Sequence, residues 1–232
     1  METLLPQLLK FAQIVWINII LSGDNAVVIA LACRGLPHDK QRAGMFFGAL
    51  VAVGLRIVFT IAIATLLSTP FLKIAGGLLL LWIAVKLVTG DDHDETAVKE
   101  SDRLWEAIRT VAIADAVMSL DNVLAIAAVA KDSTVLLVLG LAISIPLIIA
   151  GAAVIMALLA RFPILVWAGA GLLGWVAGEM LVSDPWLAER FGEAAIHRFE
   201  WPAAALGAGL VLALGFALSR RSAAERIPHR QA

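Results

Sequence analysis

The sequence predicts an all-α, polytopic membrane protein. Of its 232 residues, 61% are hydrophobic and only 16% are charged, whereas soluble domains are about half apolar and about a quarter charged. The mean hydropathy is correspondingly high, at +0.90. A membrane-spanning helix needs about 20 mostly apolar residues. Seven stretches of this kind predict seven transmembrane helices, at about 11–33, 43–67, 70–89, 107–130, 134–160, 163–182 and 202–219.

The first span begins directly after METLLPQLLK. This segment lacks a basic region, and the apolar stretch after it has no small-residue cleavage site following a short apolar run. We therefore interpret that stretch as the first transmembrane helix rather than as a cleaved signal. Lys and Arg in the connections then set the orientation. Eleven lie on one side and five on the other if the N-terminus is outside and the C-terminus inside. We therefore expect an N-out/C-in, multi-pass protein of the inner (plasma) membrane.

The same composition excludes several classes of protein. The net charge of −1 lacks the basic excess that nucleic-acid binding requires. The single cysteine, Cys33, cannot form an intramolecular disulfide,. The expected partners are the lipid bilayer and a small cargo. The sequence leaves the oligomeric state open, a homo-oligomer included.

An internal repeat organises the chain. NIILSGDNAVVIALA, from Asn18, aligns with DAVMSLDNVLAIAAV, from Asp115, at a constant offset of 97 residues. PFLKIAGGLLLLWIAVK, from Pro70, also aligns with PILVWAGAGLLGWVAGE, from Pro163. Each copy holds three spans, so the second copy must enter the membrane from the opposite side. This 3+3 inverted repeat with one extra C-terminal helix is typical of secondary transporters.

The whole chain, 1–232, is interpreted as one transporter domain. Its predicted parts are repeat 1 (about 8–89), a cytosolic acidic linker (90–106), repeat 2 (about 107–182), an outer loop (183–201), the seventh helix (202–219) and a basic cytosolic tail (220–232). The linker contains DDHDE, from Asp91 to Glu95. This run is either a solvated loop or a patch that collects metal ions.

The repeats place ionisable groups inside spans, where each costs at least about 2.5 kcal/mol on insertion scales and marks a functional hypothesis. The carboxylates are Asp24, Asp115 and Asp121, with amides at Asn25 and Asn122. Carboxylate and amide oxygens suit a hard divalent cation such as Mg²⁺, Ca²⁺ or Mn²⁺. No His lies in a predicted span. Supporting polar groups are Asn18, Ser22 and Ser119, and simple polar contacts between packed helices are the competing interpretation.

Charged residues away from the acidic set also lie within predicted spans, and Lys86, Glu179 and Arg56 need explanation. Lys86 and Glu179 occupy equivalent positions in the two repeats with opposite sign. One hypothesis is that they serve as a counter-ion or gate for the acidic site. The alternative is that the Lys86 side chain extends to the inner membrane interface. Arg56 lies mid-span, and the sequence does not name its partner.

The paired SGDNAVVIALA and DAVMSLDNVLAIAAVA segments, three spans apart, resemble the TerC family of integral membrane proteins. The short, seven-span YjbE-type branch fits best, over about residues 8–220. The resemblance implies membership of the lysine-exporter-like transporter superfamily and a role in manganese export or, in some members, tellurium resistance. It also implies that Asp24, Asn25, Asp115, Asp121 and Asn122 line the metal path.

We therefore expect a transporter, not an enzyme, that exports a divalent metal ion from the cytosol through a midplane acidic site. From the resemblance the cargo is Mn²⁺, with no permanently bound cofactor. The alternatives are an amino-acid or other small-cation exporter of the same superfamily, a passive channel and, remotely, an intramembrane aspartyl protease. The protease interpretation lacks the tyrosine of the usual motif, since the chain contains no Tyr.

Overall fold

The structure is a computed structural model that describes residues 12, 15, 16, 23–62, 69–89, 100–130 and 134–225, with only the backbone described at 61, 100, 101, 120–130, 134–137 and 221–225. In these ranges the regular secondary structure is entirely helical. The elements are α2 (Gly23–Cys33), α3 (His38–Ile61), α5 (Leu72–Thr89), α6 (Glu100–Ala130), α7 (Thr134–Arg161), α8 (Ile164–Val182), α9 (Pro185–Phe191) and α10 (Glu193–Glu225).

Five of the described helices are long and apolar enough to cross a membrane. The qualifying segments are His38–Thr60, Leu72–Thr89, Val138–Arg161, Ile164–Val182 and Glu193–Arg220. The apolar helix α2 is shorter, at 11 residues. The predicted all-helical membrane protein is therefore confirmed, while the count of seven spans stays a prediction.

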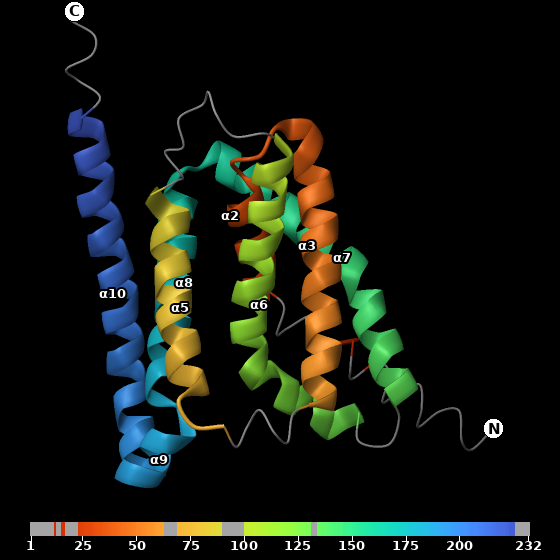
Figure 1. Ribbon diagram of the computed structural model, residues 1–232, viewed down its shortest axis with the longest axis vertical. Coiled ribbons are helices and arrows are strands. Elements are labelled where there is room, and N and C mark those ends of the chain that lie inside the picture. The colour runs from red at the N-terminus through yellow and green to blue at the C-terminus, as the bar shows by residue number, and fades with distance from the viewer. Residues whose placement is uncertain are drawn as a thin grey trace, which may run out of the picture.

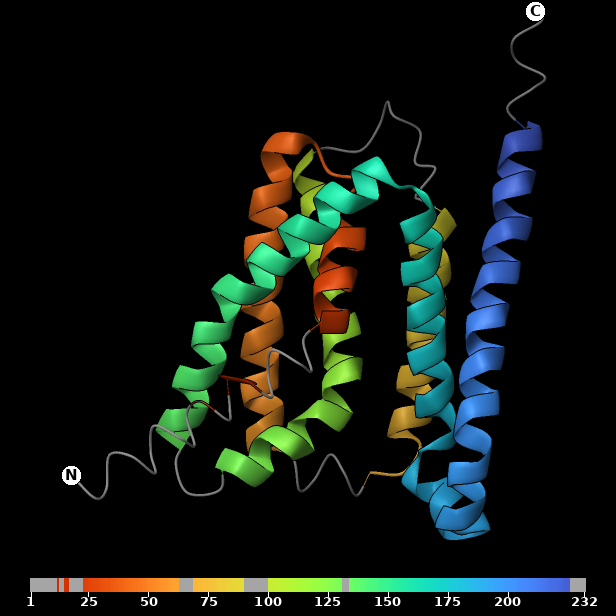
Figure 2. The same cartoon turned by 180° about the vertical axis from the view of Figure 1, so that it is seen from behind.

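The long helices alternate in direction along one axis of the molecule (Figures 1 and 2). α2 ends, and α3 begins, at the upper end of Figure 1. From there α3, α6 and α8 run downward, while α5, α7 and α10 run upward. One end of the bundle thus carries the α2–α3 and α7–α8 connections, the last turn of α5, the start of α6 and the C-terminal end of α10.

Helix packing follows a paired pattern. Two helices of the first repeat, α3 and α5, pack against α6 of the second repeat. In the same way α7 and α8 of the second repeat pack against α2 of the first. α5 and α8 also contact each other directly. One apolar core is built mainly by α2, α5, α6 and α8, with Leu159 of α7 and Val211 of α10, and a second by α2, α3, α6 and α7. Because α2 and α6 each contribute several buried side chains to both cores, side chains on these two helices lie at the centre of the bundle.

The last helix is held by close backbone packing. α10 lies against α8 and α5. A Cβ added at Gly174 would lie 2.6 Å from the backbone oxygen of Gly207, and one added at Gly178 would collide with the backbone of Ala203. Small residues four apart allow such an approach between helices in a membrane, where van der Waals packing drives association.

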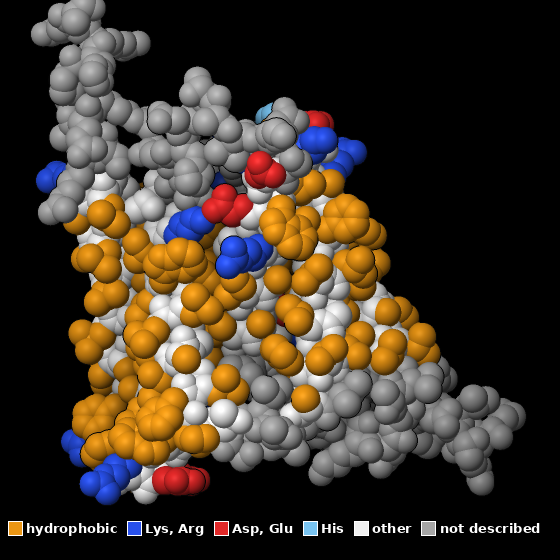
Figure 3. Space-filling model, viewed as in Figure 1, with side chains coloured by type: hydrophobic (Ala, Val, Ile, Leu, Met, Phe, Trp, Pro, Cys, Tyr) orange, Lys and Arg blue, Asp and Glu red, His pale blue; other side chains and the backbone are white. Residues whose placement is uncertain are grey.

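Large apolar side chains point outward from the bundle. Leu206 is 74% exposed, and Ile164 and Trp201 are each 71% exposed. On the face in Figure 3 hydrophobic side chains form a band, with charged side chains gathered above and below it. An exposed apolar surface of this extent is expected where lipid, rather than water, surrounds the protein.

Two predicted connections are partly helical. α6 begins at Glu100, within the segment assigned to the acidic linker. The predicted outer loop contains α9 and the first turns of α10, which continues through Pro202. These turns carry polar residues, and His197 pairs with Glu200 at 3.1 Å. Hydropathy marks only the apolar part of a helix, so it places the helix boundary too late.

Candidate functional site

The clearest feature of the bundle interior is an ion pair that joins α3 to α6. Arg56 Nη2 lies 2.9 Å from Asp115 Oδ1, and the two side chains are only 2% and 3% exposed. Ser119, one turn after Asp115, completes the arrangement. Its Oγ donates to Asp115 Oδ2 at 3.1 Å and accepts from Arg56 Nε at 3.3 Å. The partner that the sequence could not name for Arg56 is therefore Asp115.

Asp24 lies within electrostatic reach of this ion pair. It is in the first turn of α2, and both Arg56 and Asp115 are close enough to interact with it electrostatically. Its Oδ1 accepts a hydrogen bond of 2.8 Å from the backbone N–H of Asn25. The Asn25 side chain is buried, and its carboxamide oxygen accepts no hydrogen bond from the described residues. α2, α3 and α6 thus bring two carboxylates, one amide and one guanidinium together.

The second D-N motif is placed only by its backbone. Asp121 and Asn122 lie in α6, six and seven residues after Asp115, and their side chains are outside the description. Asn18 and Ser22 are outside the described residues altogether, as is the Asp91–Glu95 run. Among the side chains that are placed, no three His, Cys, Asp or Glu residues gather as a metal site.

Lys86 and Glu179 lie apart from Asp24 and from each other. Lys86, in the last turn of α5, forms an ion pair with Glu106 of α6 and lies over the ring of Trp82. Glu179 accepts a hydrogen bond of 2.8 Å from Trp175 Nε1. The antiparallel course of α5 and α8 puts Lys86 and Glu179 near opposite ends of the helix pair (Figures 1 and 2). In this conformation neither contacts Asp24 or Asp115.

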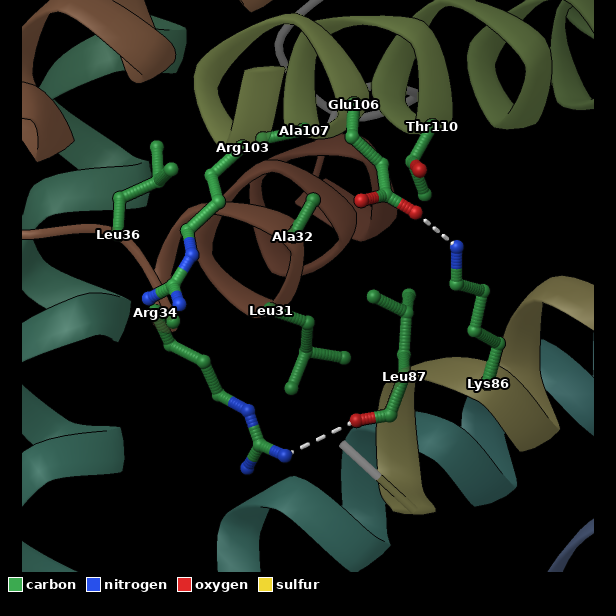
Figure 4. Close-up of a pocket in the computed structure, with 11 residues that line it drawn as sticks. Leu31, Ala32, Arg34, Leu36, Lys86, Leu87, Arg103, Glu106, Ala107 and Thr110 are labelled. Carbon is green, nitrogen blue, oxygen red and sulfur yellow. Dashed lines mark hydrogen bonds and ion pairs between the residues drawn. The ribbon is translucent and has the colours of Figure 1, made fainter. Parts of the chain in front are cut away.

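A polar cavity lies at the end of the bundle where α2 and α5 finish. Its volume is about 220 Å³, and Arg34, Lys86, Arg103 and Glu106 supply its charged groups. Figure 4 shows these side chains around the cavity together with Leu31, Ala32 and Leu87. Arg34 is held in place by a hydrogen bond of 3.0 Å from its Nη2 to the backbone oxygen of Leu87.

Sequence reasoning missed Asp184, a fully buried carboxylate between α8 and α9. It caps α9 by accepting from the backbone N–H of Trp186 at 3.0 Å. The same side chain accepts from the backbone N–H groups of Phe71 and Lys73, each at 3.1 Å, at the start of α5. The Asp-Pro pair before an apolar run is a recognisable helix start. The second helix that Asp184 caps lies 111 residues away in the chain.

The family model described as "Integral membrane protein TerC family" matches residues 4–224. The chain belongs to the TerC family. The assignment made from the two D-N motifs is thereby confirmed, and with it an integral membrane protein.

Relatives in Bacillus subtilis (strain 168) support the assignment. The protein named "Uncharacterized membrane protein YjbE" is 44% identical over 177 residues, which cover 76% of this chain and 81% of YjbE. "Uncharacterized membrane protein YkoY" is 31% identical over 118 residues, covering 48% of this chain and 36% of YkoY. No solved structure matches the chain.

Proposed function

We propose that this TerC-family protein is a transporter that exports a divalent metal ion from the cytosol, with Mn²⁺ as its cargo. In this proposal Asp24, Asn25, Asp121 and Asn122 provide the oxygen atoms that the ion meets inside the membrane. Asp115 forms part of the same wall through its pair with Arg56. The ion is a substrate that passes through, and no resident cofactor is required.

The observation that carries the proposal is the buried Arg56–Asp115 ion pair within electrostatic reach of Asp24. An unbalanced charge in a low-dielectric interior is expensive, so buried charges are paired or bind a cation. Arg56 balances Asp115. The two carboxylates that repeat in the two halves, Asp24 and Asp121, then leave two negative charges, which one dication balances.

The chemistry of these side chains favours a hard ion. Carboxylate and amide oxygens are the ligands that Mg²⁺, Ca²⁺ and Mn²⁺ prefer, whereas soft ions select thiolates and thioethers. Mn²⁺ is chosen among the hard ions because the family resemblance implies manganese export. Arg56 is the built-in counter-ion in this scheme, and Lys86 is not needed for charge balance.

The helix arrangement supports a transporter built from an inverted 3+3 repeat. α2, α3 and α5 run opposite to their sequence counterparts α6, α7 and α8. Their contacts correspond as well, because α3 of the first repeat packs against α6 of the second and α7 of the second packs against α2 of the first. Repeat-built transporters bind cargo at the repeat interface. We propose seven spans in this arrangement, N-out/C-in in the inner membrane, with α10 as the unpaired helix.

The test is Mn²⁺ transport by vesicles that carry the purified protein. Asp24→Asn and Asp121→Asn each remove one of the two charges that balance the dication, so each should abolish most of the transport. Mn²⁺ content and tolerance of cells that produce the same variants provide the second measurement. Transport at the wild-type rate by both variants would show that these carboxylates do not carry the cargo.

Asp39→Asn is the matched control. It makes the same carboxylate-to-amide change at the start of α3, where the Asp39 side chain is 69% exposed. It should transport as wild type does. Equal amounts of each variant in the membrane, measured by quantitative immunoblot, separate a transport defect from a folding defect.

One observation favours a second candidate, an exporter of basic amino acids. Asp115 and Ser119 already hold a guanidinium inside the bundle, so the interior can accommodate an organic cation. Competition distinguishes the two cargoes. Excess lysine or arginine should leave Mn²⁺ transport unchanged if the cargo is a metal ion. The rival candidate requires amino-acid efflux that is lost in Asp24→Asn while cellular Mn²⁺ stays constant.

A further inference from the structure

The cavity of about 220 Å³ at the end of α2 and α5 carries an excess of positive charge. Three basic side chains, Arg34, Lys86 and Arg103, line it with one carboxylate, Glu106. Glu106 is engaged by Lys86. Neither Arg34 nor Arg103 forms an ion pair with a carboxylate that the structure places. The cavity therefore holds two positive charges that the described residues do not balance.

The three basic side chains come from separate parts of the chain. Arg34 follows α2, Lys86 ends α5 and Arg103 belongs to the first turn of α6. Figure 4 shows their side chains and that of Glu106 around one hollow, with Thr110 beside Glu106. Bringing like charges together costs energy unless an anion is bound between them. Partial burial also lowers the pKa of the Arg34 guanidinium, so its charge is poorly solvated.

A second hollow adjoins the first. Its volume is about 1090 Å³, and it shares Arg34 and Leu36 with the smaller cavity. One wall is apolar and belongs to α7, where Ala153, Met156 and Ala157 line it, while the other carries polar side chains at the start of α3. A hollow with a charged mouth and an apolar wall has the chemistry of a lipid site, with the head group at the charge and the acyl chains along the helix.

We propose that the cavity formed by Arg34, Lys86 and Arg103 binds an anionic phosphate group. The group is supplied either by the head of an anionic phospholipid or by a free phosphate compound. Guanidinium groups suit this ligand, because their planar array of donors matches phosphate oxygens. Basic pockets between transmembrane helices are known to hold anionic head groups. The site is independent of the Asp24 site and of the identity of the transported cargo.

The test measures binding to the purified full-length protein in detergent. Native mass spectrometry counts retained phosphatidylglycerol or cardiolipin against phosphatidylcholine, and a parallel titration uses inorganic phosphate and glycerol 3-phosphate. Arg34→Gln and Arg103→Gln should each weaken binding about fivefold, and the double variant about thirtyfold. Glu106→Gln should strengthen binding, because it removes the one negative charge among the residues that line the cavity.

Matched controls distinguish local binding from a general loss of charge or fold. Arg190→Gln removes an exposed arginine at the opposite end of the bundle and should bind as wild type does. Arg34→Lys keeps the charge and should retain most of the affinity. Monodispersity on size exclusion shows whether each variant is folded.

The outcomes separate the two sources. Retention of anionic lipid that phosphate compounds do not displace assigns the site to a lipid head group. Displacement by phosphate compounds at equal affinity assigns it to a free phosphate. Equal retention of phosphatidylcholine, or full retention of the anion by the double variant, overturns the proposal.

Discussion

Arg56 and Asp115 form a buried ion pair at the point where the two halves of the chain depart from their repeat. Asp115 aligns with the uncharged Asn18. GALVAVGL, at 48–55, can also be aligned more weakly with GLAISIPL, at 140–147, and one further position places Arg56 opposite Ile148. The two unmatched charges therefore cancel each other, 2.9 Å apart. What remains symmetric is the Asp24–Asn25 and Asp121–Asn122 pair of motifs, which is the part that we assign to the cargo.

This pairing predicts that stability and transport depend on the net charge of the Arg56–Asp115 pair rather than on the identity of either residue. Arg56→Gln leaves Asp115 as an uncompensated buried carboxylate, and Asp115→Asn does the same to Arg56. Removing one partner of a buried pair costs about 3–5 kcal/mol, so each single variant should lose thermal stability and transport. The double variant Arg56→Gln/Asp115→Asn restores neutrality and should recover both. Thermal unfolding in detergent and Mn²⁺ flux in vesicles measure the two effects.

The double variant also tests whether Asp115 contacts the cargo. If Asp115 binds the ion directly, the double variant recovers stability but not flux. Recovery of flux with the neutral pair places Asp115 and Arg56 in the wall of the path. If the double variant recovers neither stability nor flux, the charge-balance argument is wrong.

A second prediction concerns Asp184, which caps two helices with one carboxylate. Asp184→Ala leaves the partly buried backbone N–H groups of Phe71, Lys73 and Trp186 without their acceptor. The cost of such a loss is about 1–3 kcal/mol, so the variant should melt at a lower temperature than wild type. Asp184→Asn keeps an acceptor oxygen and should melt between the two. An unchanged melting temperature for Asp184→Ala would rule out the double cap.

The close contact between α8 and α10 gives a third prediction. Gly178→Leu places a side chain where the backbone of Ala203 already lies, so the helices must separate. Overpacking of this kind costs about 1–3 kcal/mol, and we expect lower thermal stability. Gly209→Leu is the matched control, because a Cβ at Gly209 meets no atom within 4 Å. Equal melting temperatures for the two variants would contradict the packing of α10 on α8.

The class of fold was predictable from composition and from the lengths of the apolar stretches, because a lipid environment permits few spanning structures. The α5 and α8 boundaries fall within two residues of their predicted spans, 70–89 and 163–182. α10 begins nine residues before its predicted start at 202, since the polar turns around His197 carry no hydropathy signal.

The candidate site was predictable only in its residue types, and its use by a cargo ion stays a prediction. Repetition in the sequence identified Asp24 and Asp121, because a matched charge inside an apolar span is unlikely to arise by chance. The partners of Arg56 and Lys86 depend on how α3, α5 and α6 pack, and contacts 59 and 20 residues apart carry no local pattern. Lys86 forms an ion pair with Glu106 in this conformation, and its role as a counter-ion or gate for the acidic site stays a prediction.

The last prediction tests the proposed orientation. Cys33 is the only cysteine in the chain, so Cys33→Ala gives a background without thiols in which one new cysteine reports its side of the membrane. Asp39 and Glu189 lie in exposed positions at opposite ends of the bundle. With the N-terminus outside, Glu189→Cys should react with a membrane-impermeant maleimide in intact cells, and Asp39→Cys only after permeabilisation. The reverse pattern would contradict the N-out/C-in orientation, because the connection between α2 and α3 would then lie outside the cell.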